Sequence, residues 1–322
     1  MTEAPGRVTL WGIEAFLTTA AEGTVQAAAR RLDASASGIS QQITALETAL
    51  GAALFDRSAR PMRLTPAGQT FLRHAQAIFN ELAAARAVIG LSGLSGLASF
   101  RLGFIEDFES EVTPHLLSEL GRDWPDCQFL LETGPSHRLH EGLEARTLDL
   151  VVAADIGATN ASSEAHMILQ EPYVAVVPRG QKPGFGGADD PLPLILYTAR
   201  HHMGRQIADA MALANFHAGH RFELDSYNSI MAMVAAGSGW TILTPLGVLH
   251  AARFRDRVDL LPLPFAPLSR RIMLTVRRDI LGDMPARIAA RLRDLMQEMI
   301  VGPVLADHPW MADGLKVIGR QG

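Results

Sequence analysis

Small polar side chains cluster between residues 35 and 42 in a pattern suited to contacting nucleic acid. A helix that lies in the major groove of DNA needs such residues near its N-terminal end. Small side chains let its backbone approach, and hydroxyl and amide groups reach base edges and phosphates. The segment is therefore a candidate recognition helix, with Ser35, Ser37, Ser40, Gln41 and Gln42 as its polar residues.

Five further side chains are candidates for contacts with the phosphate backbone. Two precede the polar cluster, and three are arginines that follow it within a span of seven residues. Arginine suits phosphate recognition because its planar guanidinium donates hydrogen bonds in a fixed fork. A single arginine is as often a solvated surface charge, but three so close together favour a phosphate-binding surface. The candidates are Thr24, Gln26, Arg57, Arg60 and Arg63.

The remaining side chains do not form the patterns of a catalytic or metal site. The sequence has no glycine-rich phosphate loop, nucleophile elbow or pair of catalytic carboxylates. Three histidine pairs lack a nearby Cys or a third ligand at the usual spacing. We therefore expect no enzymatic activity, no bound metal and no cofactor. The pairs are His137 with His140, His201 with His202, and His217 with His220.

The polar cluster must be positioned by short helices. Residues 9–50 predict three such helices, because apolar residues recur there at three- and four-residue intervals. Gly23 ends the first helix, Thr24 caps the second, and Ser35 opens the third. Two short helices joined by a tight turn are the outline of a helix-turn-helix. The strand-prone segment 54–65 then predicts a two-stranded wing.

A long amphipathic helix is predicted after the wing, with Thr65 as its cap and Pro66 in its first turn. Its apolar face continues for about seven turns, a rod of about 36 Å. The surrounding chain is too short to bury this rod, which favours a homodimer formed through the helix. The Gly- and Ser-rich residues 90–96 predict a hinge. The apolar residues are Phe71, Leu72, Ala75, Ile78, Phe79, Leu82, Ala85 and Ile89.

Strands and helices alternate from residue 100 onward. Such alternation predicts a parallel sheet with helices on its faces. More than eight expected strands over about 200 residues indicate two small α/β lobes, with the chain returning to the first lobe near Arg271. The cleft between two such lobes is where small molecules bind.

These elements predict a multidomain chain. The expected parts are a winged helix-turn-helix domain at 1–66, a linker helix with its hinge at 67–96, an α/β domain at 97–302, and a C-terminal tail at 303–322 without an assigned role. Within the α/β domain, lobe I is expected at about 97–173 and 272–302, and lobe II at about 174–271.

The composition excludes several classes of protein. Of 322 residues, 48% are hydrophobic and 20% are charged, as in folded rather than disordered chains. Cys127 is the one cysteine, which excludes an intramolecular disulfide and a Cys-rich zinc module. No export signal and no apolar run of about 18 residues is found, so we expect a cytoplasmic protein with no membrane partner. The net charge of −5 is carried by the part after residue 96, since residues 1–96 hold eight arginines and seven acidic residues.

Residues 15–68 resemble the winged helix-turn-helix of the LysR-type transcriptional regulators. Many fixed spacings agree over about fifty residues, and the segments 148–152 and 233–245 add looser matches. The family's layout would cover nearly the whole chain: a DNA-binding domain, a linker helix, and a two-lobed effector domain like a periplasmic binding protein. The matching positions are Phe16, Gly23, residues 27–29, Leu32, Ser35, Ser40, Ile43, Leu46, Glu47, Leu50, Gly51, Leu54, Phe55, Arg57, Arg60 and residues 64–68.

The resemblance implies an effector site formed by strand ends in the cleft. Glu106 and Asp107 depart from the family, which commonly has small hydroxyl residues in the first such loop. If they face the cleft, they favour a cationic or amine-bearing effector; the alternative is that they cap a helix and are solvated. The implied site residues are Glu106, Asp107, Phe108, Gly134, Pro135, Ser136, Tyr197, Thr198, Ser226, Tyr227, Asn228, Trp240 and Thr241.

By this resemblance the chain is a sequence-specific, effector-responsive transcription regulator. Its implied partners are double-stranded DNA, a small-molecule effector and further copies of itself in a homotetramer, with RNA polymerase as another candidate. Cys127 alone cannot form the two-cysteine redox switch that some members use. Two alternatives stay open: a solute-binding or enzymatic α/β protein with an incidental helical N-terminus, and a DNA-binding protein that responds to no effector.

Overall fold

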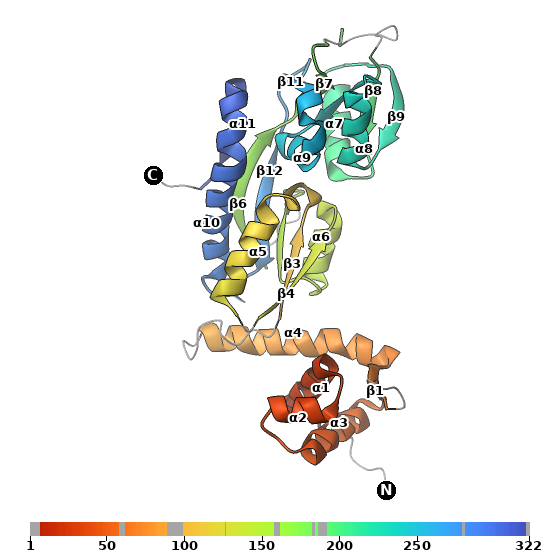
Figure 1. Ribbon diagram of the computed structural model, residues 1–322, viewed down its shortest axis with the longest axis vertical. Coiled ribbons are helices and arrows are strands. Elements are labelled where there is room, and N and C mark those ends of the chain that lie inside the picture. The colour runs from red at the N-terminus through yellow and green to blue at the C-terminus, as the bar shows by residue number, and fades with distance from the viewer. Residues whose placement is uncertain are drawn as a thin grey trace. The chain divides into compact units, whose positions relative to one another are not determined.

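The computed structural model describes residues 7–57, 62–88, 99–125, 127–157, 162–181, 184–185, 192–278 and 281–319. The chain divides into two compact units, residues 1–99 and 100–322, and each is described by itself (Figure 1). The predicted architecture, an N-terminal helix-turn-helix followed by a two-lobed α/β part, is confirmed. The finer domain boundaries at residues 66, 96 and 302 stay predictions.

Three short helices form the start of the N-terminal unit, each with the predicted cap. They are α1 (Leu10–Glu22), α2 (Val25–Arg31) and α3 (Ala36–Leu50). The side-chain oxygens of Thr24 and Ser35 accept first-turn amides of α2 and α3, while Gly23 ends α1 with a left-handed backbone. The inner faces of the helices meet in one apolar core, which includes Ile13, Phe16, Ala28, Ile39, Ile43 and Leu46.

The predicted wing and long helix follow. Strands β1 (Phe55–Asp56) and β2 (Arg63–Leu64) pair antiparallel, and α4 spans Pro66–Val88 with the Thr65 hydroxyl oxygen accepting the amide of Gly68. Gly68 is required there, because a Cβ would lie 2.1 Å from the carbonyl oxygen of Leu54. Arg60, Ile89 and the predicted hinge at 90–96 lie outside the described residues.

The apolar face of α4 is partly used within its own unit, which corrects the expectation that the chain cannot bury it. Ala75 is fully buried in the core of the N-terminal unit, and Phe71, Leu72 and Phe79 pack against that core. The rings of Phe16 and Phe71 lie 5.1 Å apart, centroid to centroid. Ile78, by contrast, is 40% exposed.

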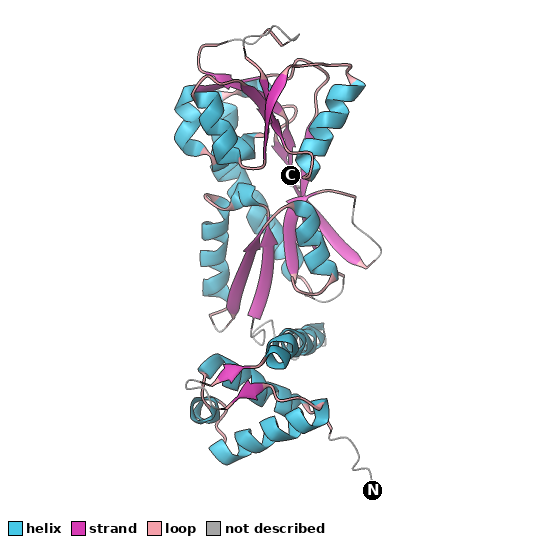
Figure 2. Ribbon diagram, turned by 90° about the vertical axis from the view of Figure 1, so that its right-hand side faces the viewer, coloured by secondary structure: helices cyan, strands magenta, loops and turns pink. Residues whose placement is uncertain are grey.

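The second unit contains two sheets flanked by helices (Figure 2). The six-stranded sheet has the order β13-β6-β12-β5-β3-β4, and the five-stranded sheet the order β11-β7-β10-β8-β9. The strands of the first are β3 (Ser99–Phe104), β4 (Gln128–Thr133), β5 (Leu150–Ala154), β6 (Ser163–Pro172), β12 (Ser269–Arg277) and β13 (Lys316–Val317). Those of the second are β7 (Val174–Pro178), β8 (Leu194–Tyr197), β9 (His220–Leu224), β10 (Trp240–Leu243) and β11 (Val258–Leu261).

Both sheets are mixed, so the prediction of parallel sheets was wrong in part. Strand β3 runs parallel to β5, and β8 runs parallel to β9 and β10, but β12 is antiparallel to β5 and β6, and β7 to β10. The cause is the connection between the lobes. The chain passes to the second sheet along β6 and returns along β12, which starts at Ser269 beside β6 (Figure 1).

The helices of this unit are α5 (Val112–Asp123), α6 (Ser136–Glu144), α7 (His202–Leu213), α8 (Tyr227–Ala235), α9 (Pro245–His250), α10 (Met284–Met296) and α11 (Gly302–Asp307). Short turns of helix cover Glu106–Phe108, Ala252–Arg257 and Pro309–Met311, and a π-turn at Gln297–Val301 joins α10 to α11. None of the helices in the described part of the chain is both long enough and apolar enough to cross a membrane.

The C-terminal residues are part of the fold rather than an extra tail. After α11 the chain returns as β13, which pairs antiparallel with β6 at Leu169 and Gln170. Met311 and Leu315 are buried, at 2% and 1% exposure. The segment that the sequence analysis left without a role as a tail therefore has a structural one, because β13 covers part of the open edge of β6.

Candidate functional site

The exposed side of α3 carries a row of polar residues. Ser37, Gln41 and Thr44 are exposed at spacings of four and three residues, so they lie on one side of the helix. Ser40 and Gln42 flank this row and are half-buried. Thr44 was missed from the sequence, although its spacing from Gln41 was a usable signal.

Two of the proposed DNA contacts also cap helices. The Ser35 hydroxyl accepts the Gly38 amide at 3.0 Å and lies 3.1 Å from the Ser37 hydroxyl. The Thr24 hydroxyl accepts the Ala27 amide at 3.2 Å. Gln26 is exposed in the first turn of α2. These residues therefore lie at helix N-termini, where amides and the helix dipole favour anionic groups.

Glu47 fixes the start of the wing and one of its arginines. Its carboxylate accepts the amides of Leu54 at 2.7 Å and Phe55 at 3.2 Å, and it pairs with Arg57 at 2.8 Å. Arg57 also donates to the Thr44 hydroxyl at 3.1 Å, so its guanidinium is held beside the polar row of α3. Arg63 is exposed on β2.

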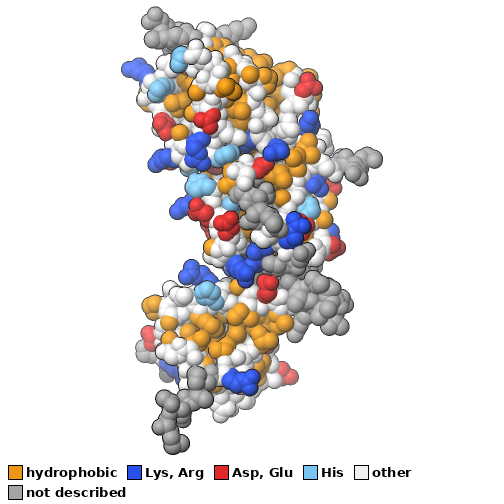
Figure 3. Space-filling view, turned by 180° about the vertical axis from the view of Figure 1, so that it is seen from behind, with side chains coloured by type: hydrophobic (Ala, Val, Ile, Leu, Met, Phe, Trp, Pro, Cys, Tyr) orange, Lys and Arg blue, Asp and Glu red, His pale blue; other side chains and the backbone are white. Residues whose placement is uncertain are grey.

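The N-terminal unit also exposes large apolar side chains. Figure 3 shows apolar side chains gathered on one face of this unit. Exposed apolar area of this kind is a common property of protein–protein contacts. The large apolar residues that are exposed in this unit are Val8, Leu10, Trp11, Leu50 and Ile78.

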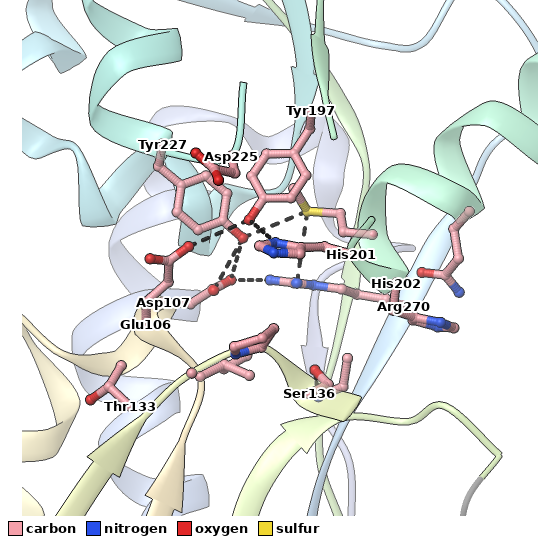
Figure 4. Close-up of a pocket in the computed structure, with 16 residues that line it drawn as sticks. Glu106, Asp107, Thr133, Ser136, Tyr197, His201, His202, Asp225, Tyr227 and Arg270 are labelled. Atoms are coloured by element: carbon pink, nitrogen blue, oxygen red, sulfur yellow. Dashed lines mark hydrogen bonds and ion pairs between the residues drawn. The ribbon is translucent and has the colours of Figure 1, made fainter. Parts of the chain in front are cut away.

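A cavity of about 180 Å³ lies in the second unit, between side chains from both sheets (Figure 4). Its walls come from the ends of β4, β5 and β8, from the residues after β3, β4, β8 and β9, from the starts of α6, α7 and α8, and from the start of β12. Loops that follow strand ends are where α/β folds bind ligands. The lining residues are Ile105, Glu106, Asp107, Thr133, Gly134, Pro135, Ser136, Ala154, Tyr197, His201, His202, Met203, Gln206, Asp225, Tyr227 and Arg270.

The family resemblance implied thirteen site residues, and seven of them are found in the cavity lining. These are Glu106, Asp107, Gly134, Pro135, Ser136, Tyr197 and Tyr227. The other six do not. Phe108 is fully buried beside Phe104, and Trp240 packs against Phe185 and Phe216.

The remaining residues are engaged locally. Thr198 donates to Glu223 at 2.6 Å, and Thr241 donates to the carbonyl of Ile195 at 2.7 Å. Ser226 caps α8, and Asn228 is half-buried in the first turn of that helix. Each stands at an end of a strand or at the start of a helix, but none of the four is among the residues that line the cavity.

Arg270 is the centre of a buried ionic cluster at the base of the cavity. Its guanidinium is paired with Asp107, lies 2.7 Å from a Glu171 oxygen, and donates to the Thr244 hydroxyl at 3.0 Å. The Tyr227 hydroxyl donates to Asp107 at 3.1 Å. The side chains of Arg270, Asp107 and Glu171 are 5%, 3% and 0% exposed, so the cluster is shielded from water.

Burial changes the acidity of several groups around the cavity. It raises the pKa of Glu171, and Asp107 adds to this while Arg270 opposes it. Burial, then the neighbouring Asp107, raises the pKa of Glu106, against smaller opposing effects of His250 and the Tyr197 hydroxyl. Burial lowers the pKa of His201 and His202, so both imidazoles are neutral near pH 7.

Aromatic and imidazole rings form one wall. The rings of Tyr197 and Tyr227 stack with centroids 5.2 Å apart. The Tyr197 hydroxyl donates to Glu106 at 3.4 Å and lies 3.1 Å from Nδ1 of His201 (Figure 4). Nε2 of His202 is buried and has no hydrogen-bond partner among the described residues.

Sequence reasoning missed several lining residues. His201, His202, Met203 and Gln206 belong to the start of α7, which directly follows the predicted strand end at Tyr197, so the same rule could have included them. Arg270 carried no such signal, because 163 residues separate it from Asp107.

Comparison with known proteins agrees with this organisation. Residues 10–69 match the model of the bacterial regulatory helix-turn-helix protein, lysR family, and residues 96–298 match that of the LysR substrate binding domain. A probable hydrogen peroxide-inducible genes activator of Mycobacterium avium is 30% identical over 281 residues, which are 84% of this chain and 88% of that protein. The HTH-type transcriptional regulator DgdR of Burkholderia cepacia is 28% identical over 236 residues, which are 73% and 78% of the two chains.

Among solved structures, the Corynebacterium glutamicum OxyR C206 mutant has a similar fold, with a TM-score of 0.68 at 22% identity, covering 95% of this chain and 96% of that one. Because both halves match, the N-terminal helices are not an incidental addition to a solute-binding protein. The chain belongs to the LysR family of DNA-binding transcriptional regulators, with a helix-turn-helix in front of a substrate-binding domain.

Proposed function

We propose that this regulator recognises a specific DNA site with the exposed side of α3 and responds to a small effector that binds in the cavity of its second unit. The observation that carries the proposal is the division of α3 into two sides. Ile39, Ile43 and Leu46 are buried, while Ser37, Gln41 and Thr44 are exposed. A helix with this division can enter the major groove without disturbing its own core.

The remaining contacts go to the phosphate backbone. We propose that Thr24 and Gln26 at the start of α2 and the wing arginines Arg57, Arg60 and Arg63 make these contacts. Ser35, Ser40 and Gln42 complete the surface beside the exposed row. Since α3 carries no arginine, sequence discrimination depends on amide and hydroxyl contacts and on the shape of the DNA.

Effector binding acts through the two lobes. The cavity takes walls from both sheets, and β6 and β12 are neighbouring strands of the connection between them. A ligand that contacts both walls favours one arrangement of the lobes over others and so shifts an existing equilibrium. By this account the protein has no catalytic role.

Assembly is proposed to involve α4. Ile78 is exposed on this helix, and further exposed apolar residues lie on α1. A dimer formed through α4 places two recognition helices on one DNA molecule, and a pair of dimers gives the tetramer expected from the family. RNA polymerase is a candidate further partner, and the cytoplasm is the proposed location.

The likeness to hydrogen peroxide-inducible activators does not support peroxide sensing here. The sequence has one cysteine, Cys127, so it cannot form a disulfide within the chain. Burial and Asp149 raise the pKa of Cys127 to about 11, which leaves little of the reactive thiolate at neutral pH.

Binding to DNA tests the proposal. The purified protein is titrated with the DNA upstream of its own gene and with random DNA of equal length, from about 50 to 200 mM salt. Gln41→Ala is expected to weaken specific binding by roughly 5- to 100-fold and to leave random binding unchanged. Gln181→Ala, the same change at an exposed position in the second unit, is the control. Equal binding of the wild type to both DNAs at every salt concentration refutes sequence-specific recognition.

A further inference from the structure

We infer that the effector is a small molecule with a protonated amine, and that Glu106 is the counter-ion of this ammonium group. The inference rests on the proposed function, because it assumes that the effector occupies the cavity. Three carboxylates and one guanidinium line the cavity among its described residues, from Glu106, Asp107, Asp225 and Arg270. The lining therefore has an excess of negative charge.

The guanidinium of Arg270 is not free to bind an anionic ligand. It is paired with Asp107 and with Glu171, and it also donates to Thr244. An incoming carboxylate would have to displace one of these buried partners and leave that carboxylate without its cation, which costs far more than a surface contact returns. The cavity is thus poorly suited to an anion at this end.

Glu106 has the opposite character. It lines the cavity and is not part of any ion pair found among the described residues, and its carboxylate is directed toward the Tyr197 hydroxyl, 3.4 Å away (Figure 4). Burial and the neighbouring Asp107 raise its pKa, which means that these surroundings disfavour its ionised form. An ammonium group beside Glu106 removes this penalty.

The other ionisable side chains that line the cavity do not supply a cation for Glu106. Asp225 already has Arg200 at 3.3 Å, and both side chains are exposed. The imidazoles of His201 and His202 are neutral at pH 7, because burial lowers their pKa. The adjacent ring of Tyr197 offers an aromatic face, which also attracts ammonium groups.

The opposite wall indicates what the rest of the ligand presents. Ser136 is buried, at 8% exposure, and its hydroxyl oxygen accepts the Ala154 amide at 3.2 Å, so the hydroxyl proton is left to donate. This donor suits a hydroxyl or carboxylate oxygen at the end of the ligand opposite its amino group. At about 180 Å³ the cavity is smaller than the roughly 300–1,000 Å³ of sites for drug-sized ligands, which suits a small metabolite.

Thermal shift with matched compounds tests the inference. The amines are ethanolamine, 4-aminobutan-1-ol, alanine and 4-aminobutyrate; the neutral and anionic counterparts are ethylene glycol, 1,4-butanediol, propionate and butyrate. Each is added to the full-length protein at about 10 mM, which detects millimolar Kd values. At least one amine is expected to raise Tm by about 2 °C or more, and its counterparts are not.

Two variants then assign the charge recognition. Glu106→Gln is expected to weaken binding of the active amine by at least roughly 10-fold in calorimetric titration, because it replaces a charge-assisted contact. Glu109→Gln is the same change at an exposed residue outside the cavity, and binding is expected to stay within about 2-fold of wild type. If no amine raises Tm, or if both variants bind the active amine equally well, the inference is overturned.

A third variant separates this inference from the proposed function. Thr133→Trp places a large side chain at an exposed position of the cavity wall. If a carboxylate or neutral compound binds and Thr133→Trp abolishes that binding, the cavity is the effector site but the amine inference is wrong. If a compound of any charge binds and Thr133→Trp has no effect, the cavity is not the effector site.

Discussion

Arg270 is the side chain on which the base of the cavity most depends. It connects β12 to Glu171 at the end of β6, to Asp107 in the loop after β3, and to Thr244 before α9. Removing a guanidinium from such a cluster leaves buried carboxylates without their cation. That penalty exceeds the net benefit of forming the pair.

Arg270→Met is therefore expected to lower the free energy of unfolding by about 3–5 kcal/mol, measured by urea denaturation. The matched control is Arg271→Met. It breaks an ion pair with Asp155 in which the arginine side chain is 55% exposed, and it is expected to cost about 0–1 kcal/mol. Similar losses in both variants would show that the buried cluster contributes no more than a surface pair.

The loss should also depend on pH. Burial raises the pKa of Glu171 in the folded chain above its ordinary value of 4.5. Protonated Glu171 therefore contributes fully to the free energy of unfolding below about pH 4.5, and this contribution is lost as the pH rises through the pKa of the folded state. Without Arg270 this pKa rises further. Arg270→Met is thus expected to lower the free energy of unfolding by less at about pH 5 than at about pH 8. An equal decrease at both pH values would contradict the electrostatic explanation.

At the scale of elements, the C-terminal segment stabilises the second unit by covering an open strand. Strand β13 pairs with β6, one of the two strands by which the lobes are connected, and Leu315 next to it is 1% exposed. Gly314 lies against Pro172 at the end of β6, where a Cβ would stand 3.1 Å from that ring. The segment therefore restrains the same end of β6 that carries Glu171.

Leu315→Ala is expected to reduce the free energy of unfolding by about 2–5 kcal/mol through lost burial and the cavity that remains. The check is chemical denaturation followed by circular dichroism. Lys316→Ala changes an exposed residue of the same strand and is expected to stay within about 0.5 kcal/mol of wild type. An effect of Leu315→Ala as small as this would mean that the segment is not anchored to the fold.

At the scale of the whole molecule, assembly and DNA binding are expected to be coupled. Two recognition helices held by one dimer bind two half-sites, and the second contact gains from its high effective concentration. In our proposal this coupling runs through the exposed side of α4, where Ile78 stands.

Ile78→Asp is expected to convert the dimer to monomer in sedimentation velocity and to weaken specific DNA binding by at least roughly 100-fold. Gln69→Asp is the control, because nine residues at about 100° each place it on the opposite side of α4. A dimer that persists in Ile78→Asp with unchanged DNA affinity would exclude this surface as the interface.

Local interactions made much of the fold predictable from the sequence. Thr24, Ser35 and Thr65 each cap the helix that they were predicted to cap, because a helix cap depends on only a few neighbouring residues. A short apolar run such as residues 194–197 indicates a strand without reference to distant residues, and β8 occupies these four positions. Strand β6 was not predicted, because half-buried, mixed residues such as Glu164 and His166 hide its alternation.

The candidate site was predictable only as far as strand ends mark it. Glu106 and Ser136 follow strands, Tyr197 ends one, and all three line the cavity. Trp240 and Thr241 instead begin β10, and both are buried in the core. Which side of the backbone faces the cavity depends on how each strand is paired and twisted within its sheet.

The sequence by itself determined the order of helices and strands and the family, because these depend on residue types at fixed short spacings. Only the tertiary structure decided that Arg270, Asp107 and Glu171 form one buried cluster, and that the C-terminal residues close the edge of β6. The physical reason is that ion pairing and strand pairing act over a few ångströms in space. The strand order of the six-stranded sheet places the start of β12 near the end of β3 and so brings together residues separated by 163 positions, and no local pattern encodes that proximity.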